Sequence, residues 1–267
     1  MTKINLNERK LAVDGRFYPI VFPDGHTEPG MSVTTVLGFV KVKSFLEEWM
    51  WDFQREMGLD GMKRFMDKKA WEGTQVHDMA EEYLKRVQEG DESYFEWTDD
   101  INKYIWKKFN TWTDWYAMRK PKVVWTEEKL QSCELLVGGR ADALLEVEEQ
   151  GTGYNYLPGG RGMFDWKTSK DFNEKHLLQL AAYIKMHEEM TGEQLDFGSV
   201  VVVGAKSKKG WKEVSIQRSK IHKGSGLNEI EHYWEGFKRA AAMVRWTLSD
   251  LKPDEYEYPR YIVPKAF

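Results

Sequence analysis

Residues 138–145, Gly-Gly-Arg-Ala-Asp-Ala-Leu-Leu, and residues 164–169, Phe-Asp-Trp-Lys-Thr-Ser, decide the fold that this sequence predicts. Both segments are apolar and strand-forming, and the stretch between them is rich in glycine. A glycine-rich stretch turns one strand back beside the next, so we expect an antiparallel pair. This pair would bring Asp142, Asp165 and Lys167 to one point.

The two carboxylates predict a metal site. Two buried acids repel each other unless a cation lies between them, and hard oxygen ligands favour one or two Mg²⁺ or Mn²⁺ ions. Asp165 and Lys167 are two apart on a strand and therefore share a face, which places an ammonium group beside the metal. There it can align a water molecule and neutralise developing charge. This combination is suited to phosphodiester cleavage.

The same residues resemble the PD-(D/E)xK nuclease superfamily. Asp142 followed by residues 165–167, Asp-Trp-Lys, matches its central motif, although the family's proline is absent here. Residues 73–77, Gly-Thr-Gln-Val-His, and 179–183, Gln-Leu-Ala-Ala-Tyr, resemble two motifs of its RecB-like exonuclease branch. Residues 32–37 resemble a segment of phage nucleases and of the mitochondrial genome maintenance exonuclease. Four motifs in the right order are more specific than any one of them.

The resemblance implies a role for each residue that matches a motif. The metal ligands would be His77, Asp142, Asp165 and the main-chain carbonyl of Trp166, and Lys167 would orient or activate the attacking water. A lone histidine on a helix is more often structural, so a packing role is the alternative for His77.

Three further residues extend this candidate site. Gln179 and Tyr183 lie one helical turn apart and share a helix face. The resemblance implies that they hold the phosphate, the scissile nucleotide or Lys167. Core packing is the alternative for Tyr183. Glu127 or its neighbour Glu128 lies on the preceding strand, and alignment with the family favours Glu127 at the edge of the metal site. A surface acid on an edge strand is the alternative.

The fold that we expect is an α/β fold with a mixed central sheet flanked by helices and an N-terminal helical layer. The resemblance makes its centre a restriction-endonuclease-like core. We predict helices at about 46–57, 76–87, 98–118, 173–190 and 227–251, and strands at about 122–131, 135–146, 163–168, 197–205 and 211–216.

The chain should form a single domain. It has 267 residues, 41% of them hydrophobic, and neither an internal repeat nor a linker divides it. Within residues 1–267 we expect an N-terminal hairpin and helical layer to about residue 120, a catalytic core at about 121–225, and a C-terminal helix and tail from about 226.

The segment from 206 to 223 is strongly basic, with Glu213 as its only acid. Its first residues, Lys-Ser-Lys-Lys-Gly, form a turn between two predicted strands. The net charge of −4 does not exclude a nucleic-acid ligand, because DNA senses the local field. A solvated surface hairpin is the alternative. We predict that four lysines contact DNA: Lys206, Lys208, Lys209 and Lys212.

Several classes of protein are excluded or disfavoured. A lone Cys133 excludes an intramolecular disulfide and a four-cysteine iron–sulfur cluster, and we expect it to be a small buried residue. The first residues carry charge and no apolar run, and no later segment approaches a membrane span. We therefore expect a soluble protein without a signal peptide, in the cytoplasm of a bacterial or phage-infected cell.

The predicted activity is that of a divalent-metal-dependent deoxyribonuclease, acting as an exonuclease on single-stranded DNA or DNA ends. The helical layer of residues 31–120 would cover the site, which would then require a free end. One alternative is a structure-specific or restriction-type endonuclease on the same core. Another is a catalytically inactive DNA-binding module, which is disfavoured because Asp142, Asp165 and Lys167 are all present. No protein partner is indicated.

Overall fold

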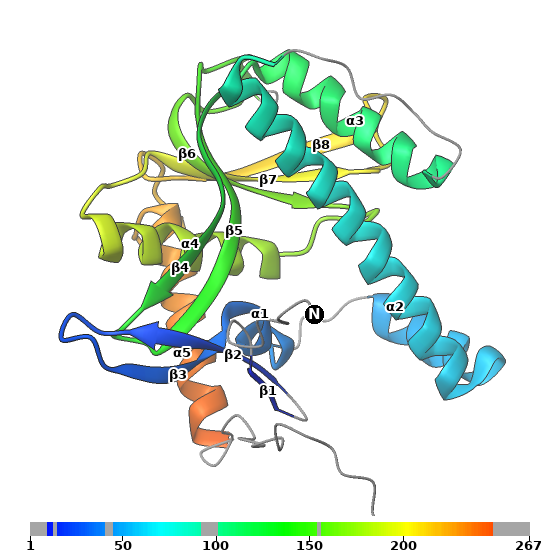
Figure 1. Cartoon of the computed structure of the whole chain (residues 1–267), viewed down its shortest axis with the longest axis horizontal. Helices are drawn as coiled ribbons and strands as arrows, with labels where there is room; N and C mark the ends of the chain where they lie inside the picture. Colours follow the sequence, from blue (N-terminus) through cyan, green and yellow to red (C-terminus); the bar gives the residue numbers. More distant parts are fainter. Residues whose placement is uncertain (1–9, 13–14, 41–44, 92–100, 154–155, 248–267) are drawn as a thin grey trace, which may run out of the picture.

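The computed structural model describes residues 10–12, 15–40, 45–91, 101–153 and 156–247 (Figure 1). The strands in these residues are β1 (Lys10–Ala12), β2 (Gly15–Val21), β3 (Thr27–Ser32), β4 (Lys122–Ser132), β5 (Val137–Val147), β6 (Gly160–Lys167), β7 (Phe197–Val203) and β8 (Trp211–Gln217). The helices are α1 (Val33–Gly38), α2 (Phe45–Glu89), α3 (Lys103–Arg119), α4 (Lys175–Thr191) and α5 (Glu229–Thr247).

The strands form one mixed sheet, so the predicted α/β class is confirmed. Its order is β1-β2-β3-β5-β6-β7-β8, and β4 pairs with the other edge of β5. The β3–β5 and β6–β7 pairs are parallel, whereas the remaining pairs are antiparallel. The glycine-rich stretch does return the chain antiparallel, as predicted, because β6 pairs with β5 in that sense.

Helices cover both faces of this sheet (Figure 1). One apolar core lies between the sheet and α1, α4 and α5, and a second lies between the sheet and α2 and α3. The second core is aromatic: Trp166 of β6 packs at 5.6 Å from Trp112 and at 5.1 Å from Trp115, measured between ring centroids. Much of the tryptophan content therefore fills the interior, as aromatic side chains of this size commonly do.

Helix α2 differs from the prediction in length. Two helices were expected there, at about 46–57 and 76–87, whereas the helix runs from Phe45 to Glu89. Gly58, with φ 71° and ψ 171°, interrupts the helical geometry, so the first predicted helix does end at this glycine. The apolar side chains expected at positions 46–57 lie outside the described side chains.

Helix α3 begins at Lys103 and not near residue 98, because the side chain of Asn102 accepts a hydrogen bond from the Tyr104 N–H and caps the helix. Residues 98–100 lie outside the described residues. Cys133 is half-buried in the turn between β4 and β5, so the expectation of a fully buried thiol is wrong. Among the described helices, none combines the length and apolar character that crossing a membrane demands.

A fork in the sheet positions the acidic residues. Along one edge β5 first pairs with β3, up to Ser32–Gly138, and then with β6 from Ala143–Phe164 onward. Beyond Phe164, β6 continues beside β7 alone. The stretch of β5 from Gly139 to Asp142 therefore faces a gap between diverging strands, where side chains can fill the space that a strand pairing would otherwise occupy.

Candidate metal centre

Asp142 lies in this fork and joins three segments. Its residue is 7% exposed, its Oδ2 accepts a hydrogen bond of 2.6 Å from the main-chain N–H of Trp166, and its Oδ1 is 3.3 Å from Nδ1 of His77. A carboxylate that accepts a main-chain N–H in place of a strand pairing is held in one orientation. Asp142 therefore faces α2, and its hydrogen bond to the Trp166 N–H holds β6 beside β5.

His77 reaches the fork because α2 comes close to the end of β6. One turn earlier, a Cβ added to Gly73 would lie 3.2 Å from Oγ1 of Thr168, so a side chain there would crowd the loop after β6. The glycine of the Gly-Thr-x-x-His segment therefore allows α2 to approach the sheet closely. The His77 side chain is 25% exposed, so it faces both the carboxylate and the solvent.

Glu127 completes a group of three candidate ligands. Glu127 lies opposite Asp142, because its neighbours on β4 pair with the neighbours of Asp142 on β5: Thr126 with Ala143 and Glu128 with Ala141. Its φ of 54° departs from strand geometry, while Glu128 is exposed. One ligand atom from each of His77, Glu127 and Asp142 lies within 4.8 Å of the others. Of the two neighbouring acids, the structure therefore brings Glu127 to the centre.

Asp165 and Lys167 form an ion pair beside this group. The lysine Nζ lies 2.9 Å from Asp165 Oδ1, to which it donates a hydrogen bond, and 2.6 Å from Oδ2. Asp165 is 1% exposed. The prediction placed both aspartates in one ligand set, whereas Asp142 lies with His77 and Glu127, and Asp165 is engaged by the lysine. The side chains of residues 165 and 167 do share a face, as their spacing predicts.

The pKa values reflect acids packed close together. Burial raises the pKa of Glu127 to about 7, and the charge of Asp142 adds to this shift while Arg140 opposes it. Burial also raises the pKa of Asp165 to about 6, with Lys167 opposing and Asp142 contributing to the rise. Each of these carboxylic acids is therefore easier to protonate than an exposed one.

The histidine and its carboxylate stabilise each other. Burial lowers the pKa of His77, but the charge and hydrogen bond of Asp142 outweigh burial, so the pKa of His77 lies above its usual value. Burial raises the pKa of Asp142, and His77, Lys167 and the Trp166 N–H together hold it below its usual value. The centre thus favours positive charge beside Asp142, which a divalent cation would also supply.

Gln179 and Tyr183 approach the centre from α4. Gln179 Nε2 donates a 3.1 Å hydrogen bond to Tyr183 Oη, so the predicted pair is formed. The tyrosine is 3% exposed, and a Cβ added to Gly139 would lie 2.7 Å from its ring. Burial raises the pKa of Tyr183 and the charges of Asp165 and Asp142 raise it further, which keeps the phenol protonated. Tyr183 therefore packs in the core and also faces the acids.

The residues present fit a hard divalent cation. Two carboxylates and an imidazole offer their ligand atoms together. Asp165 adds a third carboxylate beside this group, buried and paired with the Lys167 ammonium at 2.6 Å. Imidazole with carboxylate oxygens suits Mn²⁺ and tolerates Mg²⁺. Trp166 contributes its N–H to Asp142, and the role of its carbonyl as a ligand stays a prediction.

The basic hairpin between β7 and β8 presents the predicted lysines outward: Lys206, Lys208, Lys209 and Lys212 are all exposed. The only acid of the segment, Glu213, turns inward. Its fully buried side chain accepts hydrogen bonds from Ser199 Oγ and Trp115 Nε1, each at 2.8 Å, and lies 3.4 Å from Arg119 Nε. The outer surface of the hairpin is therefore more positive than the sequence count suggests.

Two residues near the centre were not predicted. Arg140 Nε lies 3.1 Å from Glu127 Oε2, and its position two residues before Asp142 on the same strand was the available signal. Lys108 of α3 is 8% exposed and donates a hydrogen bond to the carbonyl of Thr168, directly after Lys167. Nothing local marks Lys108, because its contact spans 60 positions of sequence.

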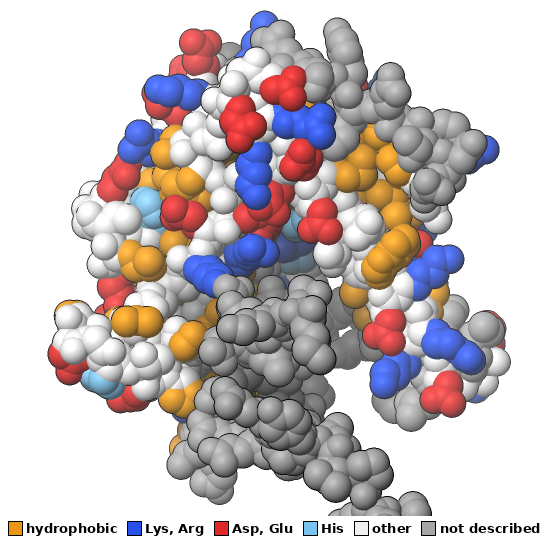
Figure 2. All heavy atoms as spheres, in the orientation of Figure 1, with side chains coloured by type: hydrophobic (Ala, Val, Ile, Leu, Met, Phe, Trp, Pro, Cys, Tyr) orange, Lys and Arg blue, Asp and Glu red, His pale blue; other side chains and the backbone are white. Residues whose placement is uncertain are grey.

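Acidic and basic side chains intermix over the face that carries α2, β4 and β5 (Figure 2). This surface is not a uniformly basic one, so any phosphate ligand would be guided by local groups. No protein-family model matches the sequence, and no curated protein is significantly similar to it.

Proposed function

We propose that the chain is a metal-dependent deoxyribonuclease with a restriction-endonuclease-like core, acting as an exonuclease on single strands or DNA ends. The observation that carries the proposal is the meeting of His77, Glu127 and Asp142 within 4.8 Å, beside the ion-paired Asp165 and Lys167. Structural ion pairs are common. A buried pair that lies next to three converging ligand atoms in a strand fork is better explained as a catalytic centre.

The proposed chemistry divides between the chain and its cofactor. A bound Mg²⁺ or Mn²⁺ would act as a Lewis acid and stabilise the charge that develops on the phosphate and the leaving oxygen. His77, Glu127, Asp142 and Asp165 would hold it. Lys167 would orient the attacking water and offer its positive charge to the phosphate. Gln179 would hold the phenol of Tyr183 in place beneath the site.

Attack from an end follows from the position of the helical layer. His77, a candidate ligand, belongs to α2, and Lys108 ties α3 to the loop after β6. A strand that reaches the acids must therefore pass beside both helices, which a flexible single strand does more easily than a duplex. An endonuclease would need the same residues but an open path across the site.

Digestion of a linear and a covalently closed circular single strand tests this function. With Mg²⁺ or Mn²⁺ we expect the linear strand to be degraded and the circle to resist. The same reactions in excess chelator, and with Ca²⁺, should show no cleavage, because Ca²⁺ accepts similar oxygens with looser geometry. Rapid linearisation of the circle would favour the endonuclease. Cleavage that survives the chelator would refute the metal mechanism.

A further inference from the structure

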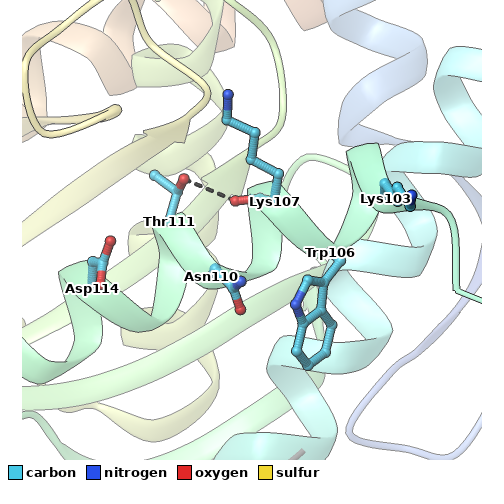
Figure 3. A pocket seen from close by; sticks show the side chains of 6 residues that line it. All are labelled: Lys103, Trp106, Lys107, Asn110, Thr111 and Asp114. Carbon is cyan, nitrogen blue, oxygen red and sulfur yellow. Dashed lines mark hydrogen bonds between the residues drawn. The ribbon is translucent and has the colours of Figure 1, made fainter. Parts of the chain in front are cut away.

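The outer face of α3 carries a shallow hollow of about 600 Å³ (Figure 3). Six side chains of this helix line it: Lys103, Trp106, Lys107, Asn110, Thr111 and Asp114. Trp106 is half-buried, and Figure 3 shows its ring and the extended Lys107 side chain pointing in opposite directions across this face. The volume lies within the range of small-ligand sites, but the hollow is open along the helix, which suits an extended ligand better than a compact one.

The basic hairpin packs against α3 beside this hollow. A Cβ added to Gly210, at the hairpin tip, would lie 3.2 Å from Cγ2 of Thr111. The hairpin tip, which carries exposed lysines, therefore adjoins the helix whose lysines line the hollow. Among the residues that line the hollow the only acid is Asp114, at one end. Two basic segments that are far apart in sequence thus form one surface.

This surface is tied to the candidate metal centre. Lys108, on the inner side of α3, donates to the Thr168 carbonyl, and its Cε would lie 3.6 Å from a Cβ added to Gly204 at the end of β7. Its Nζ also lies 4.7 Å from the centroid of the Tyr104 ring. Helix α3 is therefore fixed against the strand ends that carry Asp165 and Lys167, so its outer face has a set position relative to them.

We propose that the outer face of α3 and the hairpin tip together bind the single-stranded DNA that leads to the metal centre, an inference that rests on the proposed function. Lys103 and Lys107 would contact phosphates, and Trp106 would stack on a base. A basic track with an aromatic platform is how single strands are bound without regard to sequence. A rigid duplex would offer Trp106 no unpaired base.

Binding of fluorescent oligothymidylates of about 4 and about 20 nucleotides in Ca²⁺ buffer tests the proposal. The short strand fills the metal centre, whereas the long strand also reaches α3. In the Lys103→Gln, Lys107→Gln double variant we expect the long strand to lose at least about fivefold in affinity relative to the short one. Its log-log salt slope should fall by about 0.7 for each phosphate that the variant no longer binds. Trp106→Leu should show a similar length-dependent loss.

Lys122→Gln is the matched control, because Lys122 is an exposed lysine on β4 with a 79% exposed side chain. It should bind both lengths as the wild type does, and melting temperatures should verify that every variant folds. Equal long-strand affinity in the wild type and the α3 variants overturns the inference, even if the wild type degrades DNA. Length-dependent loss in a protein that cleaves no DNA supports the binding surface and rejects the nuclease.

Discussion

The carboxylate of Asp142 connects β5 with three other elements at the candidate centre. It accepts the Trp166 N–H of β6 at 2.6 Å, faces His77 of α2 at 3.3 Å, and lies within 4.8 Å of a Glu127 oxygen from β4. The tryptophan N–H and the histidine meet different oxygens of the group. The side chain of Asp142 therefore both orders the strand fork and offers a ligand atom.

Lys167 allows the proposed chemistry to be tested. Its Nζ contacts the two carboxylate oxygens of Asp165, and its side chain is 20% exposed. Lys167→Ala should lower the rate of DNA cleavage by about a hundredfold or more, because a charge aimed at the transition state is removed. DNA affinity should change little. Cleavage by this variant at nearly the wild-type rate would remove the lysine from the mechanism.

At the scale of elements, two consecutive glycines let β5 pack closely against β2 and α4. Gly138 lies beneath Tyr18, and Gly139 lies beneath Tyr183, with added Cβ atoms 2.9 Å and 2.7 Å from these side chains. The Gly-Gly dipeptide near the start of β5 is thus explained by packing. Its consequence is that Tyr183, and with it Gln179, reaches the acids.

Gly139→Ala should therefore separate α4 from β5. Overpacking of this kind costs about 1–3 kcal/mol, so we expect a loss of that size in the free energy of unfolding. Gly38→Ala is the control, because an added Cβ there meets no atom within 4 Å. Urea denaturation compares the two variants. Equal stabilities would mean that Tyr183 moves aside without cost.

The hairpin is the second element with a testable role. Changing Lys206, Lys208 and Lys209 to Ala should weaken binding alike for unrelated DNA sequences. The log-log salt slope should fall by about 0.7 to 0.9 for each phosphate that these lysines neutralise in the wild type. Affinity measured over a series of salt concentrations gives the slope. A slope equal to that of the wild type would mean that the hairpin is a solvated surface that does not contact DNA.

Local patterns predicted the elements better than they predicted the site. The strands, the break at Gly58 and the close approach at Gly73 follow from apolar runs and glycine positions, which are local properties. Glu127 reaches the centre because the β4–β5 register sets it opposite Asp142 and because its φ is positive. Lys108 of α3 reaches it through a hydrogen bond to the Thr168 carbonyl, directly after β6. Neither follows from neighbouring residues. The Asp165–Lys167 ion pair follows from their spacing on one strand, whereas the grouping of Asp142 with His77 and Glu127 depends on the fork, which is a property of the whole sheet.

At the scale of the whole molecule, a buried polar network supports the aromatic core. The side chains of Arg119 and Glu213 are fully buried at 3.4 Å, and Arg119 also donates to the carbonyls of Glu148 and Pro158. This network joins α3, β8 and the segment between β5 and β6. It therefore holds the helical layer onto the sheet that carries the candidate centre.

Removing one partner of this network should destabilise the whole fold. Glu213→Ala leaves Arg119 as an uncompensated buried charge, which costs about 3–5 kcal/mol. The exposed pair Lys122–Glu146 is the control, and Lys122→Ala should change stability by less than about 1 kcal/mol. Chemical denaturation measures both. A Glu213→Ala variant as stable as the control would show that the network contributes nothing to the folding of the layer.

We propose that Asp142 belongs to a metal-dependent nuclease centre. The most direct measurement is hydrolysis of a linear single strand, with Mg²⁺ and with Mn²⁺, by the wild type and by Asp142→Asn. The asparagine retains an oxygen that can accept the Trp166 N–H, so the strand fork should persist and the melting temperature should stay close to that of the wild type. We expect cleavage to fall by about a hundredfold or more. A correctly folded Asp142→Asn protein that degrades the strand as fast as the wild type would contradict the assignment of the centre.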